Sequence, residues 1–336
     1  MIIKEAFLKE ELIEIEKFLK KFSLKLDNNL TKTFYIENDY NEIIGTISCS
    51  DYIIKDLAVD EAYQSENIAS LLVNEMLNHF RANGIYNYHV FTKPQYKLIF
   101  ESFGFRKIIE TDKVIMLEGG ASFINDKLLE IKNIINNSFG IIDENSDIGC
   151  VVINGNPITN GHLYLIEEAS KNHKMVILFV VEEDKSEFSF EERFTMAYLS
   201  TRRLGNVCVI PSSIYIVSSG TFPAYFLKDE AEVSMQHSKI DALIFNEYFM
   251  KELFIKKRYV GTETVGKMVS YNDVLKETLG DKLVIVDRLK ENNEVVSASK
   301  VRSLLHDNKI NEALECVPRE ISFILRSIAS ERYGSK

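Results

Sequence analysis

The stretch CVVINGNPITNGHLYLIEEAS, residues 150–170, joins a short apolar strand to a helix through a loop that contains glycine and proline. In an open parallel sheet, ligands bind beyond the carboxyl ends of the strands, and this loop follows such an end. Gly155 lets the backbone approach a ligand closely, and Pro157 stiffens the turn. Gly161 and His162 open the helix, whose first N–H groups carry partial positive charge. The stretch fits a phosphate site and a helix-capping turn with an incidental histidine equally well.

Apolar strands alternate with helical segments after this stretch. The segment MVILFVV, residues 175–181, is apolar at every position, as expected of a strand covered on both faces. The later strand candidates are NVCVI, DALIF, RYVG and KLVIVD, residues 206–210, 241–245, 258–261 and 282–287. The chain from about Lys300 onwards is expected to be helical. This alternation predicts an α/β fold with a doubly wound, Rossmann-like parallel sheet over residues 147–336.

The first 120 residues have a different pattern, which predicts a separate mixed-sheet domain. Two β-rich segments at 32–37 and 42–50 form a hairpin pattern, and a helical stripe covers 67–82. Further strands are expected at 52–59, 85–92 and 113–118, and Gly104 suits the end of a short helix that Pro94 opens. The first residues are expected to form an amphipathic helix. Residues 121–146 are expected to be a connecting helix and linker.

Composition excludes several classes of protein. The chain has 336 residues and a net charge of −10 at pH 7, which argues against a general binder of nucleic acid or of an anionic membrane surface. No apolar run is long enough to span a bilayer, and the N-terminus resembles neither a signal nor a transit peptide. The four cysteines are scattered without zinc-ligand spacing. We therefore expect a cytoplasmic protein with reduced, buried thiols.

The segment SASKVRSLL, residues 297–305, is the second candidate for an anion site. Ser297 and Ser299 can cap a helix whose first turn contains Lys300 and Arg302. Cations at a helix N-terminus oppose the helix dipole, so their presence there favours a bound anion.

Three other segments offer weaker candidates. Lys185 and Arg193 follow the strand at 175–181, although solvated surface, or an ion pair of Arg193 with Glu191 or Glu192, accounts for them as well. Gly261 ends a strand on the ligand side, and Glu263 can contact a ribose, contact a metal or cap a turn. The pair Tyr271-Asn272 either lines the substrate side of the site or lies on the surface.

The two motifs together resemble the nucleotidyltransferase superfamily. Its T/H-x-G-H motif is matched by residues 159–162 and its S-x-T-x-x-R motif by residues 297–302, with Ser299 in place of threonine. With an acetyltransferase-like first domain, the whole chain resembles the citrate lyase ligases, and the segments at 215–233, 258–275 and 297–305 are similar to that family. The resemblance implies an AMP-forming ligase that activates acetate with ATP. Its partner would be the acyl carrier subunit of citrate lyase, whose CoA-like prosthetic group provides the thiol that is acetylated.

The resemblance also implies roles for individual residues. His162 and Thr159 would contact the α- and β-phosphates, Lys185 would stabilise charge on the transferring phosphate, and Ser299 and Arg302 would hold the β- and γ-phosphates. Magnesium would accompany ATP, held mainly by phosphates and waters with at most one carboxylate. The remaining residues expected at the phosphates are Asn154, Gly155, Pro157, Gly161, Ser297 and Lys300.

The first domain resembles the GNAT acetyltransferases, which bind acetyl-CoA, with two departures. In the pyrophosphate loop at 64–69, Asn67 replaces the central glycine and Glu66 adds a negative charge, although asparagine tolerates a left-handed φ. Phe100 stands where the family often has a tyrosine acid, so no hydroxyl is available there to protonate a thiolate. We expect a non-catalytic domain that recognises the carrier or its prosthetic arm, or one that only supports the second domain.

Two other functions fit the same motifs. One is an adenylyltransferase that joins ATP to a phosphorylated small molecule, such as a coenzyme precursor of the pantetheine-phosphate type. The other is a non-catalytic nucleotide-binding or scaffold protein, which has no evident need for Lys185 as well as His162.

Overall fold

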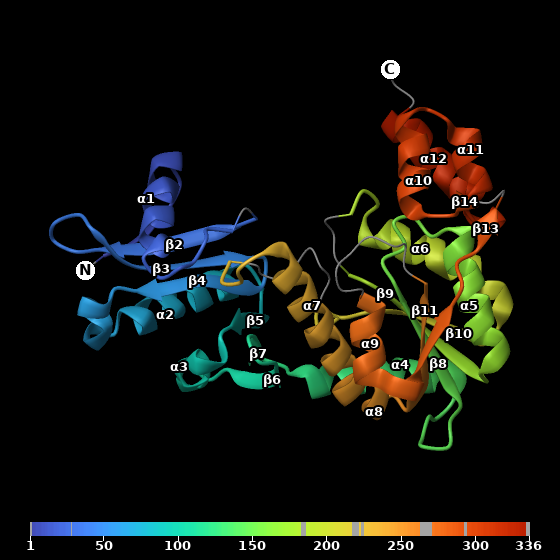
Figure 1. The fold of residues 1–336 in the computed structure, drawn as a ribbon, viewed down its shortest axis with the longest axis horizontal. Coiled ribbons are helices and arrows are strands. Elements are labelled where there is room, and N and C mark those ends of the chain that lie inside the picture. The colour runs from blue at the N-terminus through green and yellow to red at the C-terminus, as the bar shows by residue number, and fades with distance from the viewer. Residues whose placement is uncertain are drawn as a thin grey trace. The chain divides into compact units, whose positions relative to one another are not determined.

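The structure is a computed structural model that describes residues 2–27, 29–182, 186–216, 222, 225–262, 271–291 and 294–333. The chain divides into two compact units (Figure 1). The first contains residues 1–126 and 222–240, and the second contains residues 127–221 and 241–336. The segment 222–240 therefore groups with the N-terminal residues, although it lies far from them in the sequence.

The N-terminal unit is built on a seven-stranded sheet in the order β1-β2-β3-β4-β5-β7-β6. All neighbouring strands are antiparallel except β4 and β5, which are parallel and pair at only two positions. The predicted hairpin is confirmed as β2 and β3. The strands are β1 (Ile3–Glu5), β2 (Lys32–Glu37), β3 (Ile43–Ser50), β4 (Ile53–Val59), β5 (Asn87–Thr92), β6 (Arg106–Glu110) and β7 (Ile115–Gly120).

Helices cover both faces of this sheet. Along β2, Tyr35 packs into one cluster with α1 (Lys9–Lys20), whereas Phe34 and Ile36 pack into another with α2 (Ile68–Ala82), as the two-residue period of a strand requires. The N-terminal helix starts at Lys9 instead of at the first residues, because residues 3–5 pair with β2 as a strand. The short helix α3 (Lys97–Ser102) is followed by Phe103 at the C-cap and then by Gly104, whose φ of +88° agrees with the expected glycine at the helix end.

The two departures from the acetyltransferase pattern lie on ordered elements. Asn67 adopts a φ of +56° at the start of α2, so asparagine takes the left-handed conformation that glycine would provide. Phe100 is buried among the core residues of the sheet, which leaves its ring in the role of a packing residue.

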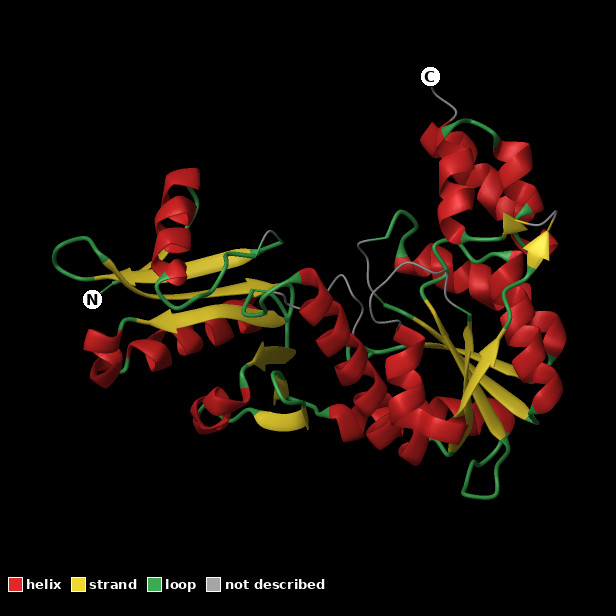
Figure 2. Ribbon diagram, in the orientation of Figure 1, coloured by secondary structure: helices red, strands yellow, loops and turns green. Residues whose placement is uncertain are grey.

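The C-terminal unit is a five-stranded sheet in the order β10-β9-β8-β11-β12, and every neighbouring pair is parallel. Figure 2 shows these strands side by side with helices on both faces of the sheet. The predicted doubly wound fold is therefore confirmed. The strands are β8 (Ile148–Ile153), β9 (Met175–Val180), β10 (Val207–Pro211), β11 (Ile255–Gly261) and β12 (Leu283–Val286).

The helices of this unit include long ones that cover the sheet and a group at the end of the chain that packs against α6. One core cluster joins β8, β9 and α5 to the C-terminal helices through residues such as Val151, Ile166, Leu178 and Leu325. The helices are α4 (Ile124–Phe139), α5 (Asn160–Asn172), α6 (Phe190–Thr201), α8 (Met250–Glu252), α9 (Tyr271–Leu279), α10 (Ala298–His306), α11 (Ile310–Glu315) and α12 (Ser322–Tyr333). The helix α7 (Glu230–Ile244) belongs to the N-terminal unit up to Ile240 and to this unit from Asp241. A two-stranded ribbon, β13 (Lys290–Glu291) and β14 (Glu294–Val295), precedes α10.

One strand prediction was wrong. The segment 241–245 forms the end of α7 and the start of a π-helical turn over Phe245–Phe249. A short apolar run fits a buried helix as well as a strand, and here Ile240 and Ile244 are buried one helical turn apart.

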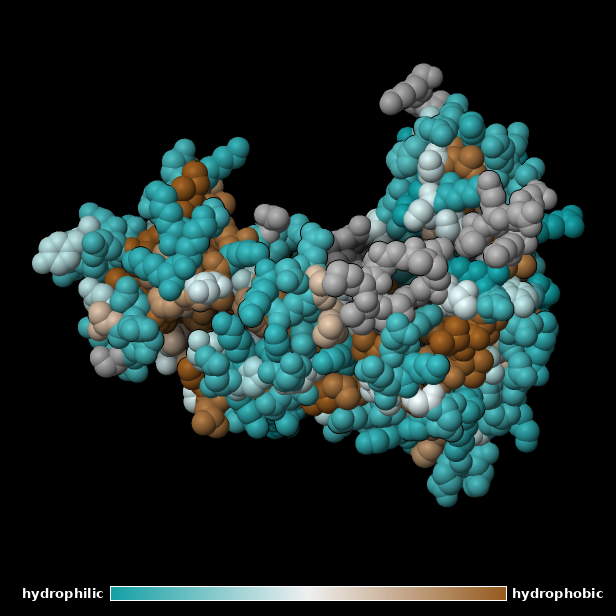
Figure 3. Space-filling model, in the orientation of Figure 1, coloured by the Kyte–Doolittle hydropathy of each residue, from teal (hydrophilic) through white to brown (hydrophobic). Residues whose placement is uncertain are grey.

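The surface agrees with the ordinary composition of the chain. In the space-filling view, most of the visible surface of each unit is hydrophilic, with separate small hydrophobic patches (Figure 3). All four cysteines are buried and free, as expected. Among the described residues, no helix has the length and apolar character needed to cross a membrane.

Candidate active site

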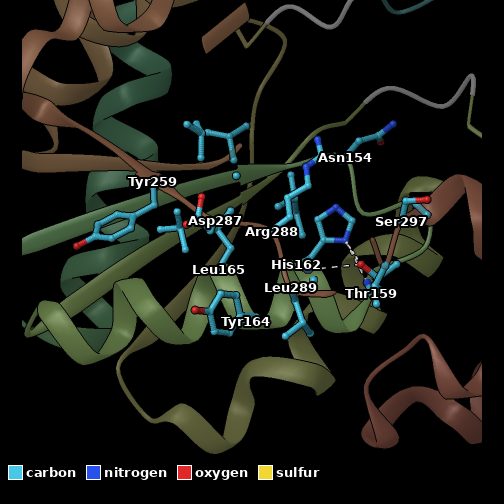
Figure 4. A pocket seen from close by; sticks show the side chains of 18 of the residues that line it. Asn154, Thr159, His162, Tyr164, Leu165, Tyr259, Asp287, Arg288, Leu289 and Ser297 are labelled. Atoms are coloured by element: carbon cyan, nitrogen blue, oxygen red, sulfur yellow. Dashed lines mark hydrogen bonds between the residues drawn. The ribbon is translucent and has the colours of Figure 1, made fainter. Parts of the chain in front are cut away.

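A cavity of about 360 Å³ lies at the carboxyl ends of β8, β11 and β12, where two helix N-termini also meet (Figure 4). β8 and β11 are neighbours in the sheet, and the chain leaves β8 toward β9 on one side while β11 continues to β12 on the other. This reversal is the switch point at which open α/β sheets bind ligands. The lining residues from the strand ends are Val152, Ile153, Asn154, Tyr259, Val260, Gly261, Val286, Asp287, Arg288 and Leu289. Those from the helices and their approaches include Thr159, Gly161, His162, Tyr164, Leu165, Tyr271, Asn272, Val296, Ser297, Ala298 and Ser299.

Thr159 and His162 form a capping box at the start of α5. The backbone N–H of His162 donates to Thr159 Oγ1 at 3.4 Å, and the backbone N–H of Thr159 donates to Nδ1 of His162 at 3.1 Å. The histidine thus takes the place that glutamate has in a common capping box. Since Nδ1 accepts a hydrogen bond, the proton of the neutral ring is assigned to Nε2. An N–H donor is therefore available on the ring atom that the cap does not use.

Burial lowers the pKa of His162 to about 4, and the positive charge of Arg288 acts in the same direction. The imidazole is therefore neutral at pH 7 and donates a hydrogen bond without carrying a full charge. A neutral donor with a fixed tautomer suits an oxygen whose own charge is already balanced by other cations.

The low pKa predicts how stability depends on pH. Between about 6.5 and about 4 the unfolded chain binds a proton at His162 that the folded chain excludes, so the free energy of unfolding falls as the pH falls. Protonation of His162 in the unfolded chain lowers the free energy of unfolding by up to about 3 kcal/mol as the pH falls through that window. Urea unfolding of the wild type and of His162→Asn at several pH values measures it. The comparison cancels the contributions of other groups, and equal slopes for both proteins would contradict the prediction.

The two motifs meet at the N-termini of α5 and α10. A Cβ atom at Gly161 would lie 3.1 Å from the carbonyl oxygen of Val296, a tight contact, so glycine suits the close approach of the two backbones. Arg302 donates from Nη1 to the carbonyl oxygen of Asn156 at 2.6 Å and from Nη2 to Ser299 Oγ at 3.2 Å. The loop after β8 and the first turn of α10 are therefore joined directly.

Ser297 caps α10, as predicted. Its hydroxyl accepts the backbone N–H of Lys300 at 3.2 Å. Ser297→Ala is expected to lower the free energy of unfolding by about 1 kcal/mol, because that N–H then loses its partner. Chemical denaturation checks this, with Ser303→Ala on the exposed face of the same helix as the matched control. An equally small effect of both substitutions would contradict the cap.

Arg193 is a buried structural residue and does not line the cavity. Its Nη1 donates to the carbonyl oxygens of Asn154 and Val181, at 2.8 and 2.6 Å, and to the Asn154 side chain at 2.9 Å. Its Nε donates to the carbonyl oxygen of Phe188 at 3.1 Å. The arginine thus fixes the ends of β8 and β9, while the nearby Glu192 pairs with Arg332.

A buried polar cluster supports the wall of the cavity. Nη2 of Arg258 donates to Asp241 Oδ2 at 3.1 Å and to the hydroxyl of Tyr271 at 2.8 Å, and that hydroxyl donates to Asp241. Asn272 donates to the carbonyl oxygen of Gly261 at 2.9 Å. The first residues of α9 therefore line the cavity, but their polar groups are used to hold the helix in place. Burial raises the pKa of Tyr271, which keeps its hydroxyl protonated.

The sequence-predicted residues divide into three groups. Those that line the cavity are Asn154, Thr159, Gly161, His162, Gly261, Tyr271, Asn272, Ser297 and Ser299. Those outside the lining are Gly155, Pro157, Lys300 and Arg302, on the loop after β8 and on α10, and Arg193, on α6. Lys185 and Glu263 lie outside the described residues. Asp287 and Arg288 line the cavity but were not predicted, although they directly follow an apolar strand at the same sheet edge.

A doubly wound parallel sheet with a cavity at its switch point, bordered by two helix N-termini, is the architecture in which open α/β domains typically bind nucleotides. Comparison with protein families identifies the family to which this domain belongs. Residues 148–324 match the citrate lyase ligase C-terminal domain, and residues 30–107 match the acetyltransferase (GNAT) domain. The chain belongs to the citrate lyase ligase family and is an enzyme of the ligase class.

Relatives match nearly the whole chain. Citrate (pro-3S)-lyase ligase of Haemophilus influenzae is 32% identical over 316 residues, which cover 90% of this chain and 92% of that protein. The ligase of the same name from Escherichia coli strain K12 is 29% identical over 319 residues, 92% of this chain and 88% of that protein. Among solved structures, a GNAT-family acetyltransferase from Staphylococcus aureus Mu50 covers 36% of this chain and all of its own, with 16% identity and a TM-score of 0.31. The family favours the ligase over the adenylyltransferase and the non-catalytic scaffold.

Proposed function

We propose that this protein activates acetate with ATP and transfers the acetyl group to the thiol of the CoA-like prosthetic group on the acyl carrier subunit of citrate lyase. In the first step, an acetate oxygen bonds to the α-phosphorus and the bond to the β-phosphate oxygen breaks, so that pyrophosphate leaves with the electron pair. In the second step, the prosthetic-group thiolate bonds to the acetyl carbon and AMP leaves with the electron pair of the broken C–O bond.

One observation carries this proposal: the His162 donor and the starts of both helices border one cavity at the switch point of the sheet. Phosphoryl transfer needs positioning and charge stabilisation more than covalent help from the protein. The Nε2–H of His162 would donate to the α-phosphate. Ser299 would hold the outer phosphates, with Arg302 beside it on α10. Lys185, which lies outside the described residues, keeps its proposed role as the cation at the transferring phosphate.

Magnesium would accompany ATP at this site. Among the described residues, no group of three or more acidic, histidine or cysteine side chains could hold a metal ion by itself. Among the described residues of the cavity lining, Asp287 is the single carboxylate. This donor set fits an ion held by phosphates and waters with a single carboxylate, and the ion would neutralise charge on the phosphates.

The N-terminal unit would recognise the carrier or its prosthetic arm without catalysing acetyl transfer from acetyl-CoA. Asn67 keeps the left-handed turn of the loop but adds a side chain where a pyrophosphate would meet bare backbone. Phe100 provides no acid. The domain limits of 1–120, 121–146 and 147–336, and a cytoplasmic location, remain predictions from the sequence.

One assay tests the proposal on the full chain. Incubated with ATP and magnesium, the protein should form pyrophosphate only when acetate is present, and AMP should appear when the carrier thiol is added. Pyrophosphate formation that requires a phosphomonoester would instead support the adenylyltransferase. ATP binding without turnover on either acceptor would support the scaffold.

A further inference from the structure

Arg288 is a cation of the cavity that belongs to neither sequence motif. It lies two residues after the end of β12. Of the described residues that line the cavity, Arg288 is the single lysine or arginine, whereas Lys300 and Arg302 lie outside the lining. This guanidinium therefore comes from the end of β12, whereas the two helix N-termini at the cavity belong to α5 and α10.

Among the described residues, the hydrogen bonds of Arg288 involve its backbone N–H and its Nε atom, and not its two terminal amino groups. Its backbone N–H donates to Thr262 Oγ1 at 3.2 Å, and its Nε donates to the carbonyl oxygen of Thr262. The stem lies over Gly261, where a Cβ atom would touch the arginine Cγ at 3.6 Å. Within the described parts of the chain, no carboxylate forms an ion pair with Arg288, not even that of the neighbouring Asp287. The two terminal amino groups thus stay available for a ligand.

Arg288 faces the histidine of the first motif. Figure 4 shows Arg288 beside the His162 ring, whereas Asp287 lies toward Tyr259. Burial is the main cause of the low pKa of His162, and the positive charge of Arg288 lowers it further, as this placement requires. A phosphate oxygen that accepts a hydrogen bond from Nε2–H of His162 would consequently lie near the guanidinium of Arg288. Because the imidazole is neutral, the arginine would provide the positive charge that balances the phosphate.

We propose that Arg288 binds the phosphate group that stays with the nucleotide, the α-phosphate of ATP and the phosphate of AMP. The assignment rests on the proposed function for the identity of the nucleotide. Because this phosphate is present in ATP, in the acetyl-adenylate and in AMP, Arg288 would act in both steps of the reaction. Residues of the second motif would contact only the phosphates that leave as pyrophosphate.

The experiment compares affinities for ATP and for AMP by calorimetry, using the full chain and the variants Arg288→Gln and Arg288→Lys. In Arg288→Gln, loss of a charge-assisted hydrogen bond is expected to weaken the binding of both nucleotides by about tenfold or more. The factor should be similar for ATP and for AMP. Lysine should restore part of the affinity. Arg202→Gln, an exposed arginine of the same unit outside the cavity, is the matched control and should bind as the wild type does.

Other outcomes overturn the assignment. A loss of ATP affinity with unchanged AMP affinity would place Arg288 at the outer phosphates, and unchanged affinity for both would remove it from the site. Titration of the His162 ring by NMR gives a readout without catalysis: its pKa should rise in Arg288→Gln, and an unchanged value would contradict the proximity. If the wild type itself binds neither nucleotide, the proposed function fails, and that result is distinct from a defect confined to Arg288 variants.

Discussion

His162→Ala is expected to lower acetate-dependent pyrophosphate formation by about 100- to 1000-fold, since one preorganised donor to a reacting phosphate contributes about 3–4 kcal/mol to lowering the barrier. The ring has two separate tasks. Its Nδ1 accepts the backbone N–H of Thr159 and closes the cap of α5, while the opposite nitrogen carries the proton that would reach the phosphate. Alanine removes both, so this variant alone cannot separate folding from chemistry.

Two conservative variants separate the tasks. His162→Asn keeps an acceptor near the Nδ1 position and removes the distal donor, whereas His162→Gln can place an amide N–H near the Nε2 position. We expect the asparagine variant to be as inactive as alanine but closer to the wild type in stability. The glutamine variant should recover part of the rate. Initial rates of pyrophosphate release and thermal unfolding of each variant provide the two readouts. Near-normal turnover of His162→Asn would show that the distal donor is not used.

Much of the C-terminal fold could be predicted because its signals are local. The apolar run at 175–181 and the loop at 154–162 define a buried strand and a helix start without reference to the rest of the chain. The segment 241–245 was misassigned because its apolar residues belong to the end of a longer helix. Asp241 is the first residue of that segment, and its partner Arg258 lies 17 residues further on, so no neighbouring residue indicates why an acid is buried at this position.

The site shows the same limit. Thr159 and His162 are neighbours on one turn, so their spacing already predicts the cap. Arg288 follows a strand in the way that many surface arginines do. Its position at the cavity depends on β12 lying beside β11 and β11 beside β8. Strand order is a property of the whole sheet, and no pattern around residue 288 contains it.

Asp241→Asn is expected to destabilise the C-terminal unit by about 3–5 kcal/mol, because it removes the countercharge of a buried guanidinium. Arg258 is 2% exposed and Asp241 is 4% exposed, so water cannot replace the missing carboxylate. The Nε and Nη1 atoms of Arg258 have no hydrogen-bond partner among the described residues, and its guanidinium lies 4.2 Å from the ring centre of Phe245. The Asp241 carboxylate and the Tyr271 hydroxyl thus account for its polar contacts.

Thermal unfolding followed by circular dichroism measures the loss, and the transition that ATP shifts upward identifies the C-terminal unit. Glu247→Gln, an exposed acid of the turn that follows α7, is the matched control and should change stability by less than about 0.5 kcal/mol. A double-mutant cycle of Asp241→Asn with Tyr271→Phe should give a coupling energy of about 0.5–3 kcal/mol, since both side chains bond the same guanidinium. Because Tyr271 and Asn272 begin α9 at the cavity wall, the loss of the ion pair should also weaken ATP binding. An Asp241→Asn protein as stable as the Glu247→Gln control would show that the pair is solvated and does not hold this wall in place.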